Sequence, residues 1–292
     1  MHQLYDFDKH IIVAIIRITP NLIEFLQDDF NFELTLRLVD DLHLQNKIQQ
    51  LKPPFRYRQL ITVLFTRFIL NKALGNAAFE KVSFVYNKYG KQCIEGVEFN
   101  TSSSNDVIAI ALHSSPIGID LSHAVQNVSP KDYKQQYEPI FHSSELSQVD
   151  SYFKFNHFWT LKEAFTKLIG CGLNVELSDF YFTLSVEEFA EDEYCLGSCL
   201  YRGNESTVVD VRWYDKIAIN ADKLFKENNE FVSGLVNEFH CYSTVIEKGQ
   251  GGRLPVICSV ITQQPNINIK TLDVDFLTVL QRQLHTHFTN ST

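Results

Sequence analysis

Residues 154–173, KFNHFWTLKEAFTKLIGCGL, decide how the second half of this 292-residue chain folds. Aromatic and aliphatic side chains recur there at helical spacing, at Phe155, Phe158, Leu161, Phe165, Leu168 and Ile169. The spacing predicts a helix with one face buried against a core. We expect the helix to end at Gly170 or Gly172, since glycine accepts the left-handed conformation of a C-terminal cap.

Three charged side chains line the rim of this predicted helix, namely Lys162, Glu163 and Lys167. At about 100° per residue, Glu163 and Lys167 fall just beside the apolar face. They could form an ordinary exposed pair four residues apart, worth about 0.2–0.5 kcal/mol. They could instead line a ligand site, and the helix alone leaves both interpretations open.

Other periodic segments surround this helix. A second helix is predicted over residues 56–74, ending at Gly75, and a last one near 272–287. Strand patterns occupy residues 11–18, 82–86, 107–112, 117–121, 180–186, 208–214, 239–246 and 254–261. We therefore predict an α+β fold of two similar halves, residues 1–115 and 116–292, each with a long helix packed on a mostly antiparallel sheet.

Composition limits the function classes. A hydrophobic content of 45% allows a sizeable core, and the net charge of −9 argues against a general nucleic-acid or anionic-membrane binder. One basic pocket for a small anion stays compatible with that charge. The apolar run at 11–18 contains Arg17 and follows two aspartates, so it predicts a strand and not a signal peptide. Six scattered cysteines suit a reduced compartment, and we expect a cytoplasmic protein without a membrane or nucleic-acid partner.

A carboxylate stands in an apolar setting at Asp120, within the strand-like sequence PIGIDLS. It could be a strand-end residue that faces solvent or caps the next segment. Gly118, two positions earlier, would permit close approach of a ligand to the backbone. Asp120 is therefore a second candidate for a site.

Five short motifs occur in a fixed order between Gly90 and Leu173, over less than a third of the chain. Taken together they resemble the phosphopantetheinyl transferase superfamily of the long, pseudo-dimeric type, whose pattern is GKP, FN-x-SH, G-[IV]-D, F-x-x-x-E and W-x-x-KE-[AS]-x-x-K-x-x-G-x-G-L. The corresponding segments here are Gly90 to Gln92, Phe99 to Ser103, Gly118 to Asp120, Phe141 to Glu145, and Trp159 to Leu173.

This resemblance implies an activity and a set of site residues. A carrier-protein serine would attack the β-phosphorus of coenzyme A, accept phosphopantetheine and release adenosine bisphosphate. Mg²⁺ would neutralise the diphosphate. By the family pattern, Asp120 and Glu163 would hold the metal and, with Lys167, form the catalytic set. The residues implied to bind coenzyme A are Lys91, Ser102, Lys162 and Lys167.

Two departures from the family pattern affect the implied site. Family members usually carry histidine at Ser103, where it binds the ribose phosphate, so Ser103 itself or another basic residue such as Arg56 would have to contribute there. Many bacterial members have an acidic residue at Ser122, and the lysine-pathway eukaryotic group often lacks it. Water would then complete the metal coordination.

The implied partners are apo carrier proteins, with aminoadipate reductase of lysine biosynthesis expected because the sequence resembles the fungal cytosolic branch of the family. We expect a monomer, with the polar segment 129–137 facing the carrier. The alternatives are a non-catalytic module that binds coenzyme A or carrier proteins on the same fold, and an α+β interaction scaffold with no ligand.

Overall fold

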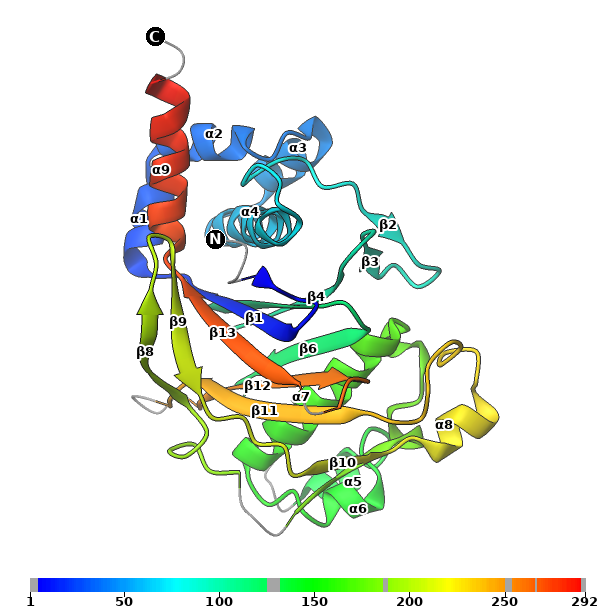
Figure 1. Ribbon diagram of the computed structural model, residues 1–292. Coiled ribbons are helices and arrows are strands. Elements are labelled where there is room, and N and C mark those ends of the chain that lie inside the picture. The colour runs from blue at the N-terminus through cyan, green and yellow to red at the C-terminus, as the bar shows by residue number, and fades with distance from the viewer. Residues whose placement is uncertain (1–4, 125–131, 186–188, 250–253, 266, 290–292) are drawn as a thin grey trace.

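The molecule is built in four layers, in the order helices, sheet, sheet and helix (Figure 1). The structure is a computed structural model that describes residues 5–124, 132–185, 189–249, 254–265 and 267–289. Two sheets pack face to face in the middle, and each carries helices on its outer face. The predicted α+β class is confirmed.

The first sheet has six strands in the order β4-β5-β1-β13-β9-β8. Their bounds are His10–Arg17 (β1), Glu98–Ser104 (β4), Val107–His113 (β5), Leu196–Arg202 (β8), Ser206–Val211 (β9) and Asn268–Val274 (β13). Strands β1 and β13 pair in parallel, whereas the other neighbours in this sheet are antiparallel. A mostly antiparallel sheet was expected from the sequence.

Alternation along β1 assigns the two faces of this sheet. Ile12, Ala14 and Ile16 pack against the outer helices, and the residues between them face the second sheet. The buried apolar run of β1 thus serves two cores at once. The outer helices are α1 (Pro20–Gln27), α2 (Asp29–Arg37), α3 (Leu42–Gln50), α4 (Phe55–Leu74) and α9 (Phe276–Thr289).

The second sheet has three strands in the order β11-β12-β6, with α7 on its outer face. Smaller elements complete this side. The bounds are Ile117–Ser122 (β6), His240–Glu247 (β11), Val256–Thr262 (β12), Tyr152–Ile169 (α7), Tyr133–Gln136 (α5), Ser143–Leu146 (α6), Asp222–Glu227 (α8), Tyr181–Leu184 (β7) and Ile217–Asn220 (β10). A two-stranded ribbon, Val85–Tyr86 (β2) and Gln92–Cys93 (β3), lies beside the first sheet.

Capping explains where the central helix begins and ends. The Ser151 side chain accepts a hydrogen bond from the Lys154 amide at the N-terminus of α7, and Gly170 adopts the left-handed conformation (φ 70°) at its C-terminus. Helix α4 ends in the same way at Gly75. Both predicted glycine stops are confirmed.

Several sequence predictions differ from the structure. Residues 268–274 form strand β13, so the last helix begins at Phe276 and not near residue 272. Because β8, β9, β13 and α9 complete the sheet and the core of the first half, residue 115 is not a clean boundary in space. The predicted strand at 82–86 shortens to the two residues of β2.

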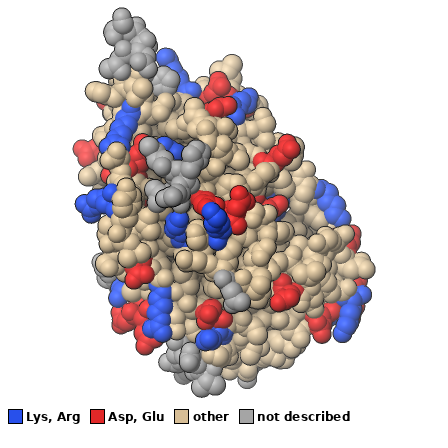
Figure 2. Space-filling model, viewed as in Figure 1, with Lys and Arg blue, Asp and Glu red and all other residues tan. Residues whose placement is uncertain are grey.

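The charge distribution on the surface and the length of the helices can be compared with the expectation of no nucleic-acid or membrane partner. On the face drawn in Figure 2, acidic and basic side chains are interspersed. Within the described ranges, no helix is long and apolar enough to cross a membrane.

Candidate active site

The site forms where edge strand β4 of the first sheet meets edge strand β6 of the second. Asp120 on β6 accepts hydrogen bonds at Oδ1 from the Ser102 hydroxyl of β4 (2.8 Å) and from Lys167 Nζ of α7 (2.7 Å). The Ser102 hydroxyl also accepts from the Leu121 amide (3.1 Å), so one side chain joins both sheet edges. Asp120 is therefore held rigidly by three elements.

The charges around Asp120 do not balance. Its Oδ2 is buried and has no hydrogen-bond partner in the structure. Burial raises the pKa of Asp120, and the neighbouring Lys167 partly opposes that rise. The pKa of Glu163 is raised as well, mainly by burial and to a smaller extent by repulsion from the Asp120 carboxylate. Two carboxylates thus share one ammonium group, which is an arrangement that a bound cation would stabilise.

The donor set fits Mg²⁺. This ion takes oxygen ligands and is commonly bound by one or two carboxylates, with water and phosphate oxygens at its other positions. Asp120 and Glu163 supply two such carboxylates, and the unpartnered Oδ2 is an available ligand atom. Among the described residues no group of three or more His, Cys, Asp or Glu side chains could hold a metal, so substrate and water would have to complete the shell.

A cavity of about 370 Å³ opens beside Lys167. Lys91, from the turn between β2 and β3, lines it, and Lys91 Nζ donates to the Leu168 carbonyl at the end of α7 (3.1 Å). Burial lowers the pKa of Lys91. Asn87 caps the same helix end by donating to the Gly170 carbonyl (2.8 Å). Two ammonium groups therefore border one cavity, next to the two carboxylates.

Comparison with known proteins agrees with this arrangement. Residues 116–207 match the 4'-phosphopantetheinyl transferase superfamily, and the matched stretch contains Asp120, Glu163 and Lys167. Within these residues the chain is similar to members of this superfamily. The resemblance inferred from the ordered motifs is thus confirmed.

Individual superfamily relatives match parts of the chain. The 4'-phosphopantetheinyl transferase gsp of Aneurinibacillus migulanus is 33% identical over 135 residues, which are 43% of this chain and 53% of the relative. The L-aminoadipate-semialdehyde dehydrogenase-phosphopantetheinyl transferase of Candida glabrata is 28% identical over 185 residues, 58% of this chain and 68% of that relative. The match thus spans about half of the first relative (53%) and about two thirds of the second (68%).

Five of the residues expected from the phosphopantetheinyl transferase pattern converge in the structure. Asp120, Ser102 and Lys167 are hydrogen-bonded together, Glu163 lies within electrostatic range of Asp120, and Lys91 borders the adjoining cavity. These residues come from β4, β6, α7 and the β2–β3 turn. The fold therefore unites segments that lie up to 76 residues apart in the sequence, from Lys91 to Lys167.

The expectation that Lys162 contacts coenzyme A phosphates is wrong. Its side chain is fully buried, at 0% exposure, and forms an ion pair with Glu145 (2.9 Å). Lys162 faces the core because it follows Phe158 by four residues and precedes Phe165 by three, which places it within the apolar face of the helix. Its position relative to those two phenylalanines was the signal that could have revealed this.

Gly118 also has a different role from the expected one. A Cβ atom on Gly118 would lie 1.9 Å from the Ala164 carbonyl oxygen, so helix α7 occupies the space that we assigned to a ligand. Glycine is required there for close packing of α7 on β6. This contact brings the backbone of α7 against the strand that carries Asp120.

Arg56 and Ser103 lie apart from the other predicted residues. The Arg56 guanidinium stacks on the rings of Phe32 and Tyr57, at 4.8 and 4.9 Å, and neither ring lines the cavity. Ser103 is exposed and is paired with Ile108, which faces the outer helices, whereas its neighbour Ser102 points toward β6. These two phosphate contacts remain predictions from the sequence alone.

One further residue near the site, Asn156, was missed by the sequence analysis. The Asn156 side chain, on α7, accepts from the Ser122 hydroxyl and the Ala124 amide and donates to the Ala124 carbonyl (2.8 Å). It thereby fixes the end of β6 just beyond Asp120 and turns the Ser122 hydroxyl toward α7. An asparagine between buried aromatic residues at 155 and 158 was the available signal.

The predicted carrier-facing segment lies only partly within the described residues. Residues 129–131 fall outside them, and α5 occupies most of the remainder. The carrier-facing role stays a prediction.

Proposed function

We propose that this protein transfers the phosphopantetheine arm of coenzyme A to a serine of an apo carrier protein, in a Mg²⁺-dependent reaction. The observation that carries the proposal is that Lys91 and Lys167 border one cavity, while Lys167 is also paired with Asp120, whose charge acts on Glu163. The carboxylates suit a divalent cation, and the ammonium groups suit phosphates.

The bond changes follow from the substrate. The carrier serine oxygen forms a bond to the β-phosphorus of coenzyme A, and the bond from that phosphorus to the bridging oxygen breaks. Adenosine bisphosphate leaves, and the serine proton passes to a water molecule held by Glu163. Bound Mg²⁺ would supply charge neutralisation for the diphosphate.

Each protein side chain has a defined part in this scheme. Lys167, which lies 2.7 Å from Asp120 and borders the cavity, would bind a phosphate oxygen of coenzyme A. Lys91 would bind the ribose phosphate from the turn that caps α7. Ser102 would orient Asp120 through the 2.8 Å hydrogen bond between their side chains. Orientation and charge, more than a protein nucleophile, account for catalysis of phosphoryl transfer.

For the carrier, we propose the carrier domain of aminoadipate reductase. The Candida glabrata relative, whose name refers to L-aminoadipate-semialdehyde dehydrogenase, supports this choice. We further propose that the protein acts in the cytoplasm and as a monomer, because one chain supplies both the β4 and the β6 sides of the site.

The test is a mass measurement on apo carrier proteins. Purified protein, coenzyme A and Mg²⁺ are incubated with the apo carrier domain of aminoadipate reductase and, separately, with a fatty-acid carrier protein. We expect a gain of one phosphopantetheine arm on the first carrier, and loss of that gain when EDTA removes the metal. No gain on any of several apo carriers would contradict the proposal.

A second candidate function is a non-catalytic module that binds coenzyme A, and the exposed serine at position 103 favours it, since a family histidine is missing there. Calorimetry separates the two functions. Both bind coenzyme A, but only the enzyme consumes it when an apo carrier is added.

A further inference from the structure

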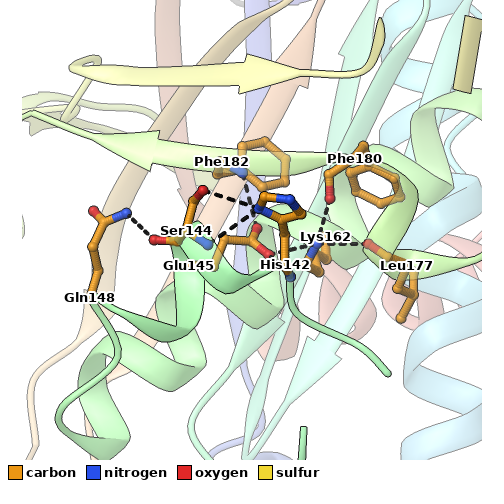
Figure 3. Close-up of polar contacts among 8 residues, drawn as sticks. All are labelled: His142, Ser144, Glu145, Gln148, Lys162, Leu177, Phe180 and Phe182. Carbon is orange, nitrogen blue, oxygen red and sulfur yellow. Dashed lines mark hydrogen bonds and ion pairs between the residues drawn. The ribbon is translucent and has the colours of Figure 1, made fainter. Parts of the chain in front are cut away.

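A fully buried ion pair lies on the face of α7 that turns away from Asp120. Lys162 Nζ is 2.9 Å from Glu145 Oε2, and neither side chain is exposed to solvent. Figure 3 shows the pair between α6, which carries Glu145, and the segment that leads into β7. Three segments of the second half therefore meet at this one pair, namely residues 142–145, helix α7 and residues 177–182.

Every polar atom of the pair has a partner. The Lys162 ammonium donates to Glu145 and to the carbonyls of Leu177 (2.7 Å) and Phe180 (2.8 Å). Glu145 accepts from the amides of Phe182 (3.0 Å) and His142 (2.9 Å). The three donors of the lysine and both oxygens of the carboxylate are thus satisfied by the protein itself.

Stability alone gives little reason for such a pair. Removing two charges from water is costly, and well-packed apolar residues often replace a buried ion pair without loss of stability. What a satisfied buried network does provide is a single geometry, because a small displacement would leave a charge unpaired. The pair can therefore fix the placement of the element that carries Lys162.

That element also carries Glu163, the next residue along the chain. Consecutive side chains of a helix point about 100° apart, so fixing the direction of Lys162 fixes the direction of Glu163. On the other side of the helix, the close contact between Gly118 and the Ala164 carbonyl limits movement toward β6. Glu163 thus lies between two constraints at adjacent residues of α7.

We propose that Glu145 and Lys162 are positioning residues, which hold the rotation of α7 so that the Glu163 carboxylate faces Asp120. This inference rests on the proposed function, because it assigns the pair to metal binding by Asp120 and Glu163. Glu145 acts through Lys162 and does not contact the cavity. Breaking the pair should weaken metal binding in a protein that remains folded.

The experiment uses the double variant Glu145→Gln/Lys162→Met, which removes both charges and nearly preserves volume. Affinity for Mn²⁺ is measured by electron paramagnetic resonance with coenzyme A present, and kcat and KM are measured with an apo carrier. We expect metal affinity and kcat to fall about tenfold or more, with little change in KM for the carrier. A folded double variant with wild-type metal affinity and kcat would overturn the inference.

A second variant covers the case in which the double variant does not fold. Glu145→Gln alone keeps the shape of the side chain and its acceptor for the Phe182 amide. It should also lower metal affinity, by a smaller factor, and wild-type affinity in this variant would equally contradict the inference. Circular dichroism and a cooperative thermal transition establish folding in each case.

A surface pair on the same helix provides the matched control. Lys154 lies 2.8 Å from Asp150, and the Asp150 side chain is 68% exposed. Asp150→Asn/Lys154→Met should leave metal affinity and kcat unchanged. A wild-type protein that neither binds Mn²⁺ nor modifies a carrier would refute the proposed function and this inference together, whereas an active wild type with unaffected variants would refute the inference alone.

Discussion

Two of the lysine–carboxylate pairs of helix α7 have similar lengths and very different surroundings. Lys162 and Glu145 are 2.9 Å apart, wholly buried, and satisfied by four backbone groups of the protein. Lys167 and Asp120 are 2.7 Å apart, the lysine is 28% exposed, and one oxygen of Asp120 has no partner. Lys167 also borders a cavity, and a further carboxylate, Glu163, interacts electrostatically with both members of this pair.

The difference between the pairs separates structure from function. A network with every donor and acceptor satisfied has no capacity left for a ligand, so its contribution is to geometry. A pair with an unpartnered oxygen and excess negative charge retains that capacity. Lysine and carboxylate spacing alone would not have told the two apart.

The largest expected effect comes from breaking the satisfied pair on one side only. Lys162→Met leaves Glu145 charged and buried without its counter-charge, which should cost about 3–5 kcal/mol of unfolding free energy. Urea denaturation measures this loss. The double variant with Glu145→Gln should recover part of it, and an unchanged midpoint for Lys162→Met would show that the pair is not fixed in solution.

The next effect tests the unsatisfied pair. If Glu163 binds the metal as proposed, Glu163→Gln should lower turnover about 100-fold or more, because the variant would lose a carboxylate ligand at the reacting phosphate. The fold should survive, since Glu163 is only partly buried and its charge is repelled by Asp120. Carrier modification rates and thermal melting are measured together, and near-normal turnover would exclude metal binding by Glu163.

His157, also on α7, is a buried titratable residue whose pKa shift comes from burial alone, in contrast to the two lysine–carboxylate pairs. Complete burial lowers the pKa of His157 to about 3. The unfolded chain, with an ordinary histidine pKa near 6.5, binds a proton that the folded state excludes, so stability is lost as the pH falls from about 6.5 toward 3. Between pH 8 and pH 5.5, His157 should lower the free energy of unfolding by about 1.4 kcal/mol.

The measurement compares wild type with His157→Gln, whose side chain can keep a hydrogen bond to Ser243, as the His157 ring does at 2.9 Å. Unfolding free energy is determined at both pH values. The variant should lose less stability on acidification than the wild type by about that amount. Parallel pH profiles for the two proteins would contradict the neutral state of His157.

The smallest effect belongs to the exposed pair at the start of α7. Lys154→Met should change the unfolding free energy by no more than about 0.5 kcal/mol, because exposed ion pairs contribute little. Urea denaturation should give a midpoint close to that of the wild type. A loss comparable to that of Lys162→Met would mean that burial does not govern the strength of these pairs.

Local signals in the sequence predicted the helices well. The stripe from Phe155 to Ile169 and the glycine at 170 determine α7 within one segment of chain, so its face and its end could be inferred without tertiary information. Asp120 and Glu163 were predicted as metal ligands from the ordered motifs, and in the structure the two carboxylates interact electrostatically. Their individual chemistry remains a proposal.

The sequence predictions were wrong where the surroundings of a residue are formed by segments far away in the sequence. Whether Lys162 meets a ligand or the core depends on carbonyls at 177 and 180, which pack beside it only after the chain turns back into β7. The space above Gly118 is taken by α7, more than 40 residues later. The parallel pairing of β1 with β13 joins residues 10–15 to 268–273, which no local pattern reveals.

That last pairing has a consequence for how the protein is made. Strand β13 lies between β1 and β9 in the six-stranded sheet, yet it is synthesised long after β1. While a ribosome translates the chain, β1 has a free edge until residue 274 has emerged. The first sheet therefore cannot be completed before residue 274 is available, and an exposed apolar strand awaiting its partner would be a natural substrate for chaperones.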